Sequence, residues 1–440
     1  MLEKLKELTQ KFLEQSKDKD ILVISHFDTD GITSAAIMAS CLKRLNKNFS
    51  LRIVKQLEKE LIETLPQTPT LIFLDLASGN IKDLNNLKNE IYVIDHHEIN
   101  KDLPLKENLN IINPHLFGEE DLSGACLTYL FAKEISQENK SLANLAIIGM
   151  VGDILEKNIG KIGNTIINDA EMVIKKGLLL YPATRPINKA LEFSSGMFIP
   201  GVTGSSSGAI SLLKEIGVEK KDERYKSLIE LDEEENSKLI TAILLRRNQQ
   251  DTENIIGNIY LVKFLNKLED ARELSAMINA CSRLGKSHVA FSLCMGNKAA
   301  KKRAETIYTK YKQHLVEALN FVSNTKKIEG EDYVIINAEN NIKDTIIGTI
   351  ASILSMSSVY KEGTTIVAMA HNEDKIKISA RIAGRNGHKN IREVLDSVVA
   401  EIGGESGGHA KAAGCLISRE KEKSFIEILK KKLEIELVKI

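Results

Sequence analysis

The stretch "IYVIDHH" (91–97) consists of a short apolar run followed directly by one aspartate and two histidines. A run of this length that is rich in Ile, Val and Tyr is typical of a buried strand. Asp95, His96 and His97 therefore come at the carboxyl end of the expected strand. Because carboxylates and imidazoles are common metal ligands, the pattern predicts a site where the strand ends.

Two further apolar runs end in the same way. They are "ILVISH" (21–26) and "LIFLDLA" (71–77), and a helical pattern, "GITSAAIMASCLKRLN" (31–46), follows the first of them. Such alternation indicates an α/β fold with a parallel sheet flanked by helices. Ligands of these folds bind beyond the carboxyl ends of the strands. We therefore expect chemical groups from several segments to meet at one edge of the sheet.

Three more segments supply candidate ligands. In "HFDTDG" (26–31) the alternate residues share a face if the strand geometry continues, which would aim His26, Asp28 and Asp30 at one point. Asp75 ends the second run. Asp153 lies in "NLAIIGMVGDIL" (144–155), for which a helix is favoured over a strand.

The candidates matter as a group. A single Asp at a strand end is usually a helix cap or turn residue. Clustered carboxylates repel one another, and in a half-buried site they need cations. Oxygen and nitrogen donors without a thiolate suit Mn²⁺ or Mg²⁺, with Zn²⁺ and Fe²⁺ as less favoured alternatives. The set is large enough for two ions, which are a common device for phosphoester hydrolysis. The candidate donors at this stage are His26, Asp28, Asp30, Asp75, Asp95, His96, His97 and Asp153.

The composition restricts the class of protein. A chain of 440 residues predicts two or three domains. Lys+Arg and Asp+Glu both number 60, so no net charge draws the molecule to nucleic acid or to a membrane. The five cysteines form no CxxC pair, which fits a reducing cytoplasm. No apolar run approaches the roughly 20 residues of a membrane span. We expect a cytoplasmic protein without a membrane anchor.

Changes in residue composition and pattern along the chain predict three domains. Residues 1–200 form the α/β metal domain, residues 201–328 a mostly helical middle segment, and residues 329–440 a smaller mixed α/β domain across a cleft. The Gly- and Ser-rich stretch 198–218 is expected to be a connecting loop, with a phosphate-contacting loop as the alternative. A hairpin is predicted between 365–371 and 375–381, and a Gly-rich loop at 403–414. His371 and His388 are expected to be structural.

The metal motifs resemble a known family. "HFDTDG", Asp75, "DHH" (95–97) and Asp153 resemble, in order, the four motifs of the DHH phosphoesterase superfamily. "SAR" (379–381) and "GGHAKAAG" (407–414) resemble the DHH-associated domain, although Ser406 stands where many members have a third glycine. "SHFDTDGITSA" and "NACSRLG" (279–285) are most similar to archaeal RecJ-like nucleases.

The resemblance implies a role for each matching residue. His26, Asp28 and Asp75 would hold one ion, and Asp30, Asp75, His96 and Asp153 the other, with Asp75 as the bridge. His97 would contact the scissile phosphate or orient a ligand, and Asp95 would support that loop and His96; both are assigned to the catalytic group. The substrate-binding residues would be Arg381, Gly407, Gly408 and His409.

The implied function is a two-metal-ion exonuclease that hydrolyses single-stranded DNA or RNA to mononucleotides in DNA repair or replication. An oligoribonuclease or a cyclic-dinucleotide phosphodiesterase is the enzymatic alternative. A hypothesis of another class is a replisome scaffold that binds GINS, and an oligomeric protein also stays open. Such a scaffold should have lost acids from its motifs, whereas all six predicted ligands are present here.

Overall fold

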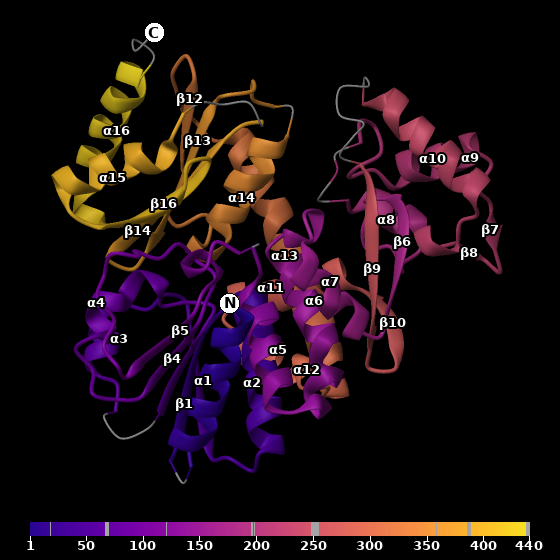
Figure 1. Cartoon of the computed structure of the whole chain (residues 1–440). Coiled ribbons are helices and arrows are strands. Elements are labelled where there is room, and N and C mark those ends of the chain that lie inside the picture. The colour runs from indigo at the N-terminus through magenta and orange to yellow at the C-terminus, as the bar shows by residue number, and fades with distance from the viewer. Residues whose placement is uncertain are drawn as a thin grey trace. The chain divides into compact units, whose positions relative to one another are not determined.

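The computed structural model describes residues 1–17, 19–66, 70–119, 121–194, 197, 199–247, 255–357, 359–384 and 389–436. The chain divides into two compact units, Met1–Tyr308 and Thr309–Ile440, and each is described by itself (Figure 1).

The described residues of the first unit contain a parallel sheet of the kind that the sequence predicts. Its strand order is β2-β1-β3-β4-β5, and all neighbouring strands run parallel. The strands are β1 (Ile21–His26), β2 (Phe49–Val54), β3 (Thr70–Leu74), β4 (Ile91–Ile94) and β5 (Leu109–Ile112). The predicted α/β fold with a helix-flanked parallel sheet is therefore confirmed.

Helices cover both faces of this sheet (Figure 1). Ile72 and Leu74 of β3 pack in a core with helices that include α1, α2 and α5, while Leu71 and Phe73 face α3 and α4. Alternate residues of a strand point to opposite faces, so a strand buried on both sides is apolar throughout. The helices of this part are α1 (Leu2–Gln15), α2 (Thr29–Arg44), α3 (Lys59–Glu63), α4 (Ile81–Leu84), α5 (Gly124–Ile135), α6 (Ala143–Gly152) and α7 (Lys161–Asp169).

The chain turns into a helix earlier than the sequence suggested after β1. The strand ends at His26, and Asp28 caps α2 by accepting a hydrogen bond from the N–H of Gly31 at 3.0 Å. Asp30 lies in the first turn of α2. The expectation that extended backbone would aim His26, Asp28 and Asp30 at one point is therefore wrong. The N-cap competes successfully with strand continuation, because it satisfies an amide of the first helical turn.

A second sheet, which the sequence analysis missed, belongs to the first unit. Its strand order is β10-β9-β6, all antiparallel. The elements that follow α7 are β6 (Met172–Leu178), α8 (Ile187–Glu192), α9 (Ser206–Glu215), β7 (Lys220–Lys221), β8 (Arg224–Tyr225), α10 (Glu233–Arg246), β9 (Ile256–Phe264), β10 (Lys267–Asp270), α11 (Ala271–Arg283), α12 (Ser287–Cys294) and α13 (Lys298–Asn324). One hydrophobic cluster joins Leu191 and Ile199 to Leu212, so the expected boundary at residue 200 lies within a packed core.

The second unit carries a mixed sheet of order β11-β12-β13-β14-β16-β15. Only β12 and β13 pair in parallel among these described strands. The elements are β11 (Ile328–Glu329), β12 (Tyr333–Asn337), α14 (Asp344–Met356), β13 (Thr365–Asn372), β14 (Lys375–Ile382), α15 (Ile391–Ile402), β15 (Glu405–His409), β16 (Ala412–Ser418) and α16 (Glu422–Glu436). The predicted mixed α/β architecture and the hairpin between β13 and β14 are confirmed.

Two details of this unit bear on the sequence analysis. The expected Gly-rich loop at 403–414 is wrong, because most of it forms the antiparallel strands β15 and β16. Glycine is tolerated in a strand where another backbone approaches closely. His371 is bonded through Nε2 to Oε2 of Glu422 at 2.8 Å, and His388 lies outside the described residues.

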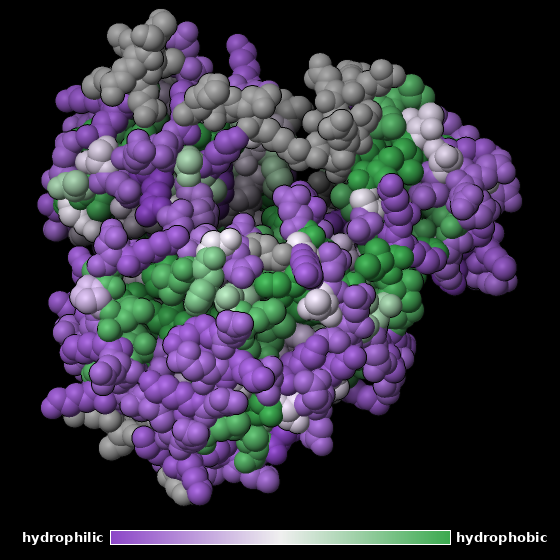
Figure 2. All heavy atoms as spheres, in the orientation of Figure 1, coloured by the Kyte–Doolittle hydropathy of each residue, from purple (hydrophilic) through white to green (hydrophobic). Residues whose placement is uncertain are grey.

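The surface matches the balanced composition. Figure 2 shows hydrophilic side chains over most of the visible face, with hydrophobic ones in separate patches. Among the described residues, no helix combines the length and the apolar character that a membrane crossing requires.

Candidate metal centre

Asp75 lies at the centre of the site, and its two carboxylate oxygens face different partners. Oδ2 lies 3.3 Å from Nδ1 of His26, which in turn lies 3.0 Å from Oδ2 of Asp28. Oδ1 lies 3.3 Å from Nε2 of His96. Asp75 directly follows β3 and has a left-handed backbone with φ of 58°, a conformation that residues other than glycine seldom adopt. One carboxylate therefore connects two sets of donors.

The second set gathers around His96. Its Nε2 lies 3.1 Å from Oδ2 of Asp153 and 3.8 Å from Oδ2 of Asp30. Ligand atoms of Asp30, Asp75, His96 and Asp153 all lie within 4.8 Å of one another, as do those of His26, Asp28 and Asp75. The structure thus brings all six predicted ligands together in two groups that share Asp75.

Backbone amides hold Asp30 in place. Its Oδ2 accepts a hydrogen bond from the N–H of Gly124 at 2.5 Å, and its Oδ1 accepts one from the N–H of Ala125 at 3.0 Å. Both amides belong to the first turn of α5, where the helix dipole favours a negative charge. A Cβ at Gly124 would lie 2.7 Å from Cβ of Asp75. Sequence reasoning missed this contact, since nothing in "DLSGACLTYL" shows which side chain its amides meet.

The electrostatics show how strongly the groups interact. Burial alone lowers the pKa of the His26 imidazole, but the Asp28 and Asp75 carboxylates outweigh it and raise that pKa well above its usual value. Burial raises the pKa of the Asp30 carboxyl, and the charges of Asp75 and Asp153 raise it further. Without cations, the cluster therefore retains protons on its imidazoles and on part of its carboxyls.

The donor atoms fit a bound cation. Oδ1 of Asp75 and Nε2 of His96 are buried, and within the described part of the chain neither has a hydrogen-bond partner of acceptable geometry. The two atoms lie 3.3 Å apart, which is close enough for a charge interaction although the hydrogen-bond geometry is poor. Two buried donors with unmet bonding capacity need an explanation, and a shared divalent cation would supply one. Carboxylates and imidazoles without a thiolate suit Mn²⁺ or Mg²⁺.

We predict that metal binding releases protons. Metal ligands bind as neutral imidazoles and ionised carboxylates, so the protons described above must leave. Because the pKa values of His26 and Asp30 are raised in the metal-free protein, a higher pH favours the metal-bound form. We expect the Mn²⁺ affinity to increase from about pH 6 to about pH 8. We also expect Mn²⁺ binding to release at least about one proton per chain. Calorimetric titration in two buffers of different ionisation enthalpy measures both. An affinity that is independent of pH would contradict the proposed ligand set.

Asp95 and His97 lie beside the metal groups in different roles. Asp95 is fully buried, and its Oδ1 accepts hydrogen bonds from the N–H of His96 at 2.8 Å and from Nδ1 of His97 at 2.7 Å. Its Oδ2 accepts one from the N–H of Ser78 at 2.8 Å. Burial alone would lower the pKa of His97, but its bond to Asp95 raises that pKa. The His97 side chain is half exposed, and one of its ring nitrogens lies within 4.8 Å of ligand atoms of Asp75 and His96, so His97 adjoins the metal groups.

The predicted substrate-binding residues lie together within the second unit. Arg381 on β14 pairs in register with Ala412 on β16, which pairs with His409 on β15. Residues opposite each other in an antiparallel sheet share a face, so Arg381 and His409 lie on one side. The guanidinium of Arg381 donates to Oγ of Ser352 at 3.1 Å and to the carbonyl of Ala380 at 2.8 Å.

The two glycines of this set differ in their surroundings. Gly408 has φ of 124°, and a Cβ there would lie 2.5 Å from the carbonyl oxygen of Ala412. Gly407 has open space around it, with nothing within 4 Å of a Cβ built there. Gly408 is therefore required by the backbone, whereas Gly407 leaves its surface open for a ligand.

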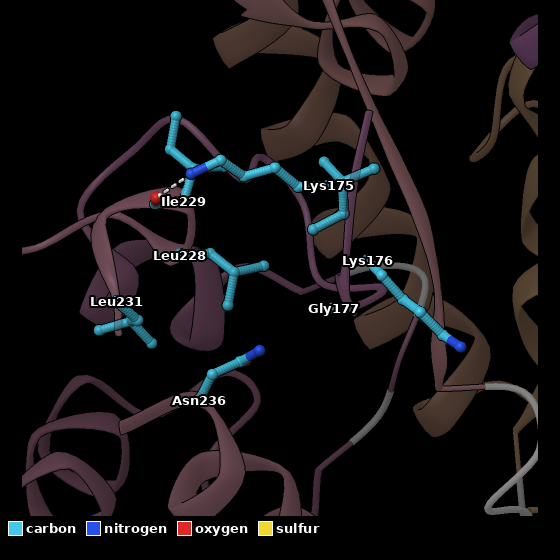
Figure 3. A pocket seen from close by; sticks show the side chains of 8 residues that line it. Lys175, Lys176, Gly177, Leu228, Ile229, Leu231 and Asn236 are labelled. Carbon is cyan, nitrogen blue, oxygen red and sulfur yellow. Dashed lines mark hydrogen bonds between the residues drawn. The ribbon is translucent and has the colours of Figure 1, made fainter. Parts of the chain in front are cut away.

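A pocket in the first unit lacks the chemistry of these groups (Figure 3). It lies beside β6 and is lined by Lys175, Lys176, Leu228, Ile229 and Asn236, among others. Lys175 Nζ is already bonded to the carbonyl oxygen of Ile229 at 2.8 Å. The lining side chains include neither a carboxylate nor an imidazole. The pocket therefore lacks the metal-binding groups expected of the reaction site.

Comparison with known proteins supports a common origin for these motifs. Family models match residues 20–150 (DHH family, N-terminal domain), residues 180–255 (DHH-CID domain) and residues 331–434 (DHHA1 domain). The uncharacterized protein MJ0831 of Methanocaldococcus jannaschii is 31% identical over 97% of this chain and 97% of its own length. YorK of Bacillus subtilis, named for a single-strand DNA-specific exonuclease, is 27% identical over 38% of this chain and 30% of its own length.

Solved structures share the fold at low sequence identity. The exonuclease RecJ bound to manganese superposes with a TM-score of 0.59 at 17% identity, covering 97% of this chain and 93% of that chain. CDC45 from Entamoeba histolytica gives a TM-score of 0.68 at 14% identity, covering 98% and 99%. Similarity at such low sequence identity shows a shared architecture but not a shared activity, because activity depends on the residues of the site.

Proposed function

This chain belongs to the DHH family, and we propose from that premise that it is a two-metal-ion exonuclease acting on single-stranded DNA or RNA. Membership makes it a metal-dependent hydrolase of phosphoesters. The finer proposal is the release of mononucleotides from a polymer end, in DNA repair or replication. Mn²⁺ is the proposed native metal, with Mg²⁺ as the alternative.

One observation carries the proposal: a single carboxylate, Asp75, belongs to both donor groups. Two divalent ions, when bound, activate water and stabilise the negative charge that develops on the phosphate oxygens. The remaining donors define two separate cation positions. His26 and Asp28 lie on the Oδ2 side of Asp75, and His96 lies on the Oδ1 side.

The other residues of the first unit have distinct proposed tasks. Nδ1 of His97 donates to Asp95, so Nε2 of the half-exposed ring donates a hydrogen bond only when the imidazole is protonated. Since the bond to Asp95 raises the pKa of His97, the ring carries more positive charge near neutral pH. We propose that this imidazole donates a hydrogen bond to an oxygen of the scissile phosphate. Asp95 acts through His97 and does not touch the substrate.

The second unit supplies the proposed grip on the rest of the strand. Arg381 and His409 share one face of the sheet, and the open space at Gly407 lets a phosphate approach the backbone closely. Phosphate contacts of this kind position a nucleic acid without reading its sequence.

We predict that Arg381→Ala and His409→Ala each raise the KM for a single-stranded oligonucleotide by about 10-fold or more, because charge-assisted hydrogen bonds contribute roughly 1.5–3 kcal/mol. The kcat at saturation should change far less, since neither residue belongs to the metal groups. Steady-state kinetics on a labelled oligonucleotide measure both. Arg419→Ala, which removes an exposed arginine of the same unit, is the control. An unchanged KM in both variants would remove these residues from the substrate site.

The test of the proposal uses end-labelled DNA and RNA 30-mers with Mn²⁺ and with Mg²⁺. A ladder that shortens from one end, with mononucleotide products, supports the exonuclease and shows its polarity and its preferred metal. Faster hydrolysis of a dinucleotide than of a 30-mer would favour an oligoribonuclease or a cyclic-dinucleotide phosphodiesterase instead. No cleavage of any of these substrates would overturn the assignment.

A replisome role beside catalysis is the second proposal. The fold shared with CDC45 favours it. The complete set of ligands argues against a scaffold without activity, because clustered acids are costly to keep where no cation is bound. Co-elution of the purified chain with GINS in size-exclusion chromatography is the test.

A further inference from the structure

Helix α11 contacts the turn that carries two of the metal ligands. Thr29 lies between Asp28 and Asp30, and its Oγ1 donates a hydrogen bond to the carbonyl oxygen of Ser275 on α11 at 2.8 Å. Both Thr29 and Ser275 are buried. The contact joins residues that are 246 positions apart in the sequence. The bond therefore joins α11 directly to the start of α2.

The same helix also contacts the turn that carries Asp153. Glu156, three residues after Asp153, is only 7% exposed, and its Oε1 accepts a hydrogen bond from Nη2 of Arg272 at 2.7 Å. The hydroxyl of Tyr260 on β9 donates to the carbonyl oxygen of Glu156 at 3.2 Å. Arg272 in turn lies over the ring of Tyr181 at 5.8 Å. The short helical turn after Asp153 is thus held by side chains from the second sheet and α11.

This turn has an unfavourable backbone. Ile154, directly after Asp153, has φ of 61° and ψ of 22°, a left-handed conformation that is costly for a β-branched residue. Its side chain is 61% exposed, so little burial offsets the cost. Strained residues persist only where the surrounding structure holds them, and they cluster at functional sites. The bonds to Glu156 hold the turn two residues after the strained one, next to Leu155, which packs against the hydrophobic core.

The two contacts act on the same part of the site. A Cβ at Gly152, the last residue of α6, would lie 2.9 Å from Cβ of Thr29 and 3.4 Å from Oγ of Ser275. The end of α6 therefore packs closely against the start of α2 and against α11, and α11 also contacts α2. This packing sets the distance between the turn of Asp28 and Asp30 and the turn of Asp153.

We propose that α11 is a clamp on the metal centre, in which Arg272 and Ser275 are positioning residues that act through Glu156 and Thr29. The inference rests on the proposed two-metal function and adds a role for the segment between the DHH-CID and DHHA1 matches. By fixing the two turns, the clamp holds Asp30 and Asp153 at the spacing that both need to serve one ion. Residues that orient metal ligands commonly change metal affinity 10- to 100-fold when they are altered.

The test compares the Arg272→Met variant with the wild type, using the full chain. Mn²⁺ that binds only the folded state stabilises it in proportion to the logarithm of 1 + [Mn²⁺]/Kd, so a fit of the melting temperature against Mn²⁺ concentration gives an apparent Kd, called here the Mn²⁺ midpoint, without any turnover. We expect Arg272→Met to raise that midpoint about 10-fold or more. Its kcat on a single-stranded 30-mer should fall, while the KM for the oligonucleotide stays near that of the wild type.

Arg185→Met is the matched control. Arg185 pairs with Glu273 of α11 at 3.0 Å, and Glu273 is as buried as Glu156, but within the described part of the chain neither side chain is hydrogen-bonded or ion-paired to a ligand turn. Its loss should lower the metal-free melting temperature and leave the Mn²⁺ midpoint unchanged. Thr29→Val removes the hydroxyl of the other contact at nearly constant volume, and it provides a second clamp variant if Arg272→Met does not fold.

The outcomes separate the clamp from the proposed function. A raised Mn²⁺ midpoint in Arg272→Met or Thr29→Val, together with a normal midpoint in Arg185→Met, supports the clamp. Normal midpoints in both clamp variants overturn it, and so does an equal rise in Arg185→Met, which would show general destabilisation. A wild-type chain that neither responds to Mn²⁺ nor cleaves nucleic acid would instead overturn the proposed function.

Discussion

Replacement of Asp75 by asparagine should reduce Mn²⁺-dependent cleavage of a single-stranded oligonucleotide by about a thousandfold. Asp75 belongs to both donor groups, so its loss removes a charged ligand from two cation positions at once. Charge stabilisation by such ions contributes several kcal/mol, and each ~1.4 kcal/mol corresponds to a factor of ten in rate. Asparagine is the informative substitution because it tolerates the left-handed backbone that Asp75 adopts.

Stability measurements distinguish this effect from misfolding. The metal-free melting temperature of Asp75→Asn should stay close to that of the wild type, whereas the increase caused by Mn²⁺ should be lost. Asp102→Asn, a change of the same kind at an exposed position beyond β4, should keep both the activity and the response to Mn²⁺. Turnover of Asp75→Asn at the wild-type rate would show that the shared carboxylate has no part in the chemistry.

Replacement of Gly149 by alanine should disturb the metal site, because the added Cβ would overlap with a metal ligand and its neighbours. A Cβ at this position of α6 would lie 2.4 Å from Cβ of Ala125, 2.5 Å from Oδ1 of Asp30 and 2.6 Å from Oγ1 of Thr33. Alanine favours a helix more than glycine does, but here the overlap with three neighbours dominates. We expect a loss of about 1–3 kcal/mol in the free energy of unfolding. Because Asp30 must move, the Mn²⁺ midpoint should also rise about 10-fold.

Gly79→Ala is the matched control for this prediction. Nothing lies within 4 Å of a Cβ built at Gly79, so the substitution should leave stability and the Mn²⁺ midpoint nearly unchanged. Chemical denaturation and thermal melts with and without Mn²⁺ measure both quantities. A Gly149→Ala variant with wild-type stability would mean that α2, α5 and α6 have room to separate, which the close approach of their backbones contradicts.

The ends of these strands could be predicted from the sequence, because each apolar run stops at an ionisable residue whose burial requires a partner. "IYVIDHH" and "LIFLDLA" have no polar residue before Asp95 and Asp75, so the end of the strand and the start of the site coincide. The parallel sheet then places these residues side by side, with the N–H of Asp75 bonded to the carbonyl of Ile94 at 2.9 Å. Fold class and candidate ligands could therefore be predicted together.

Other parts of the site depend on contacts that the sequence does not encode locally. The amides of Gly124 and Ala125 reach Asp30 only because α5 packs against α2. The clamp formed by α11 joins Thr29 to Ser275 and Glu156 to Arg272 across long sequence separations. A pattern of residue types predicts elements and strand ends, but not which side chain meets the first turn of a distant helix.

The strands of the second sheet and of the glycine-rich segment were missed for a related reason. β15 contains two glycines and no large apolar residue, so it lacks the composition of a strand. It forms because β16 offers a row of backbone partners, from Leu416 opposite Glu405 to Ala412 opposite His409. Pairing with a neighbour determined the structure here, whereas intrinsic propensity favoured a loop.

The most direct measurement is anomalous diffraction from crystals of the chain grown or soaked with Mn²⁺. The account predicts two peaks about 3.5–4 Å apart on either side of Asp75, the usual separation in two-metal sites. One should be bounded by His26 and Asp28, and the other by Asp30, His96 and Asp153. A single peak, or peaks away from Asp75, at Mn²⁺ concentrations that support cleavage would contradict the two-ion centre.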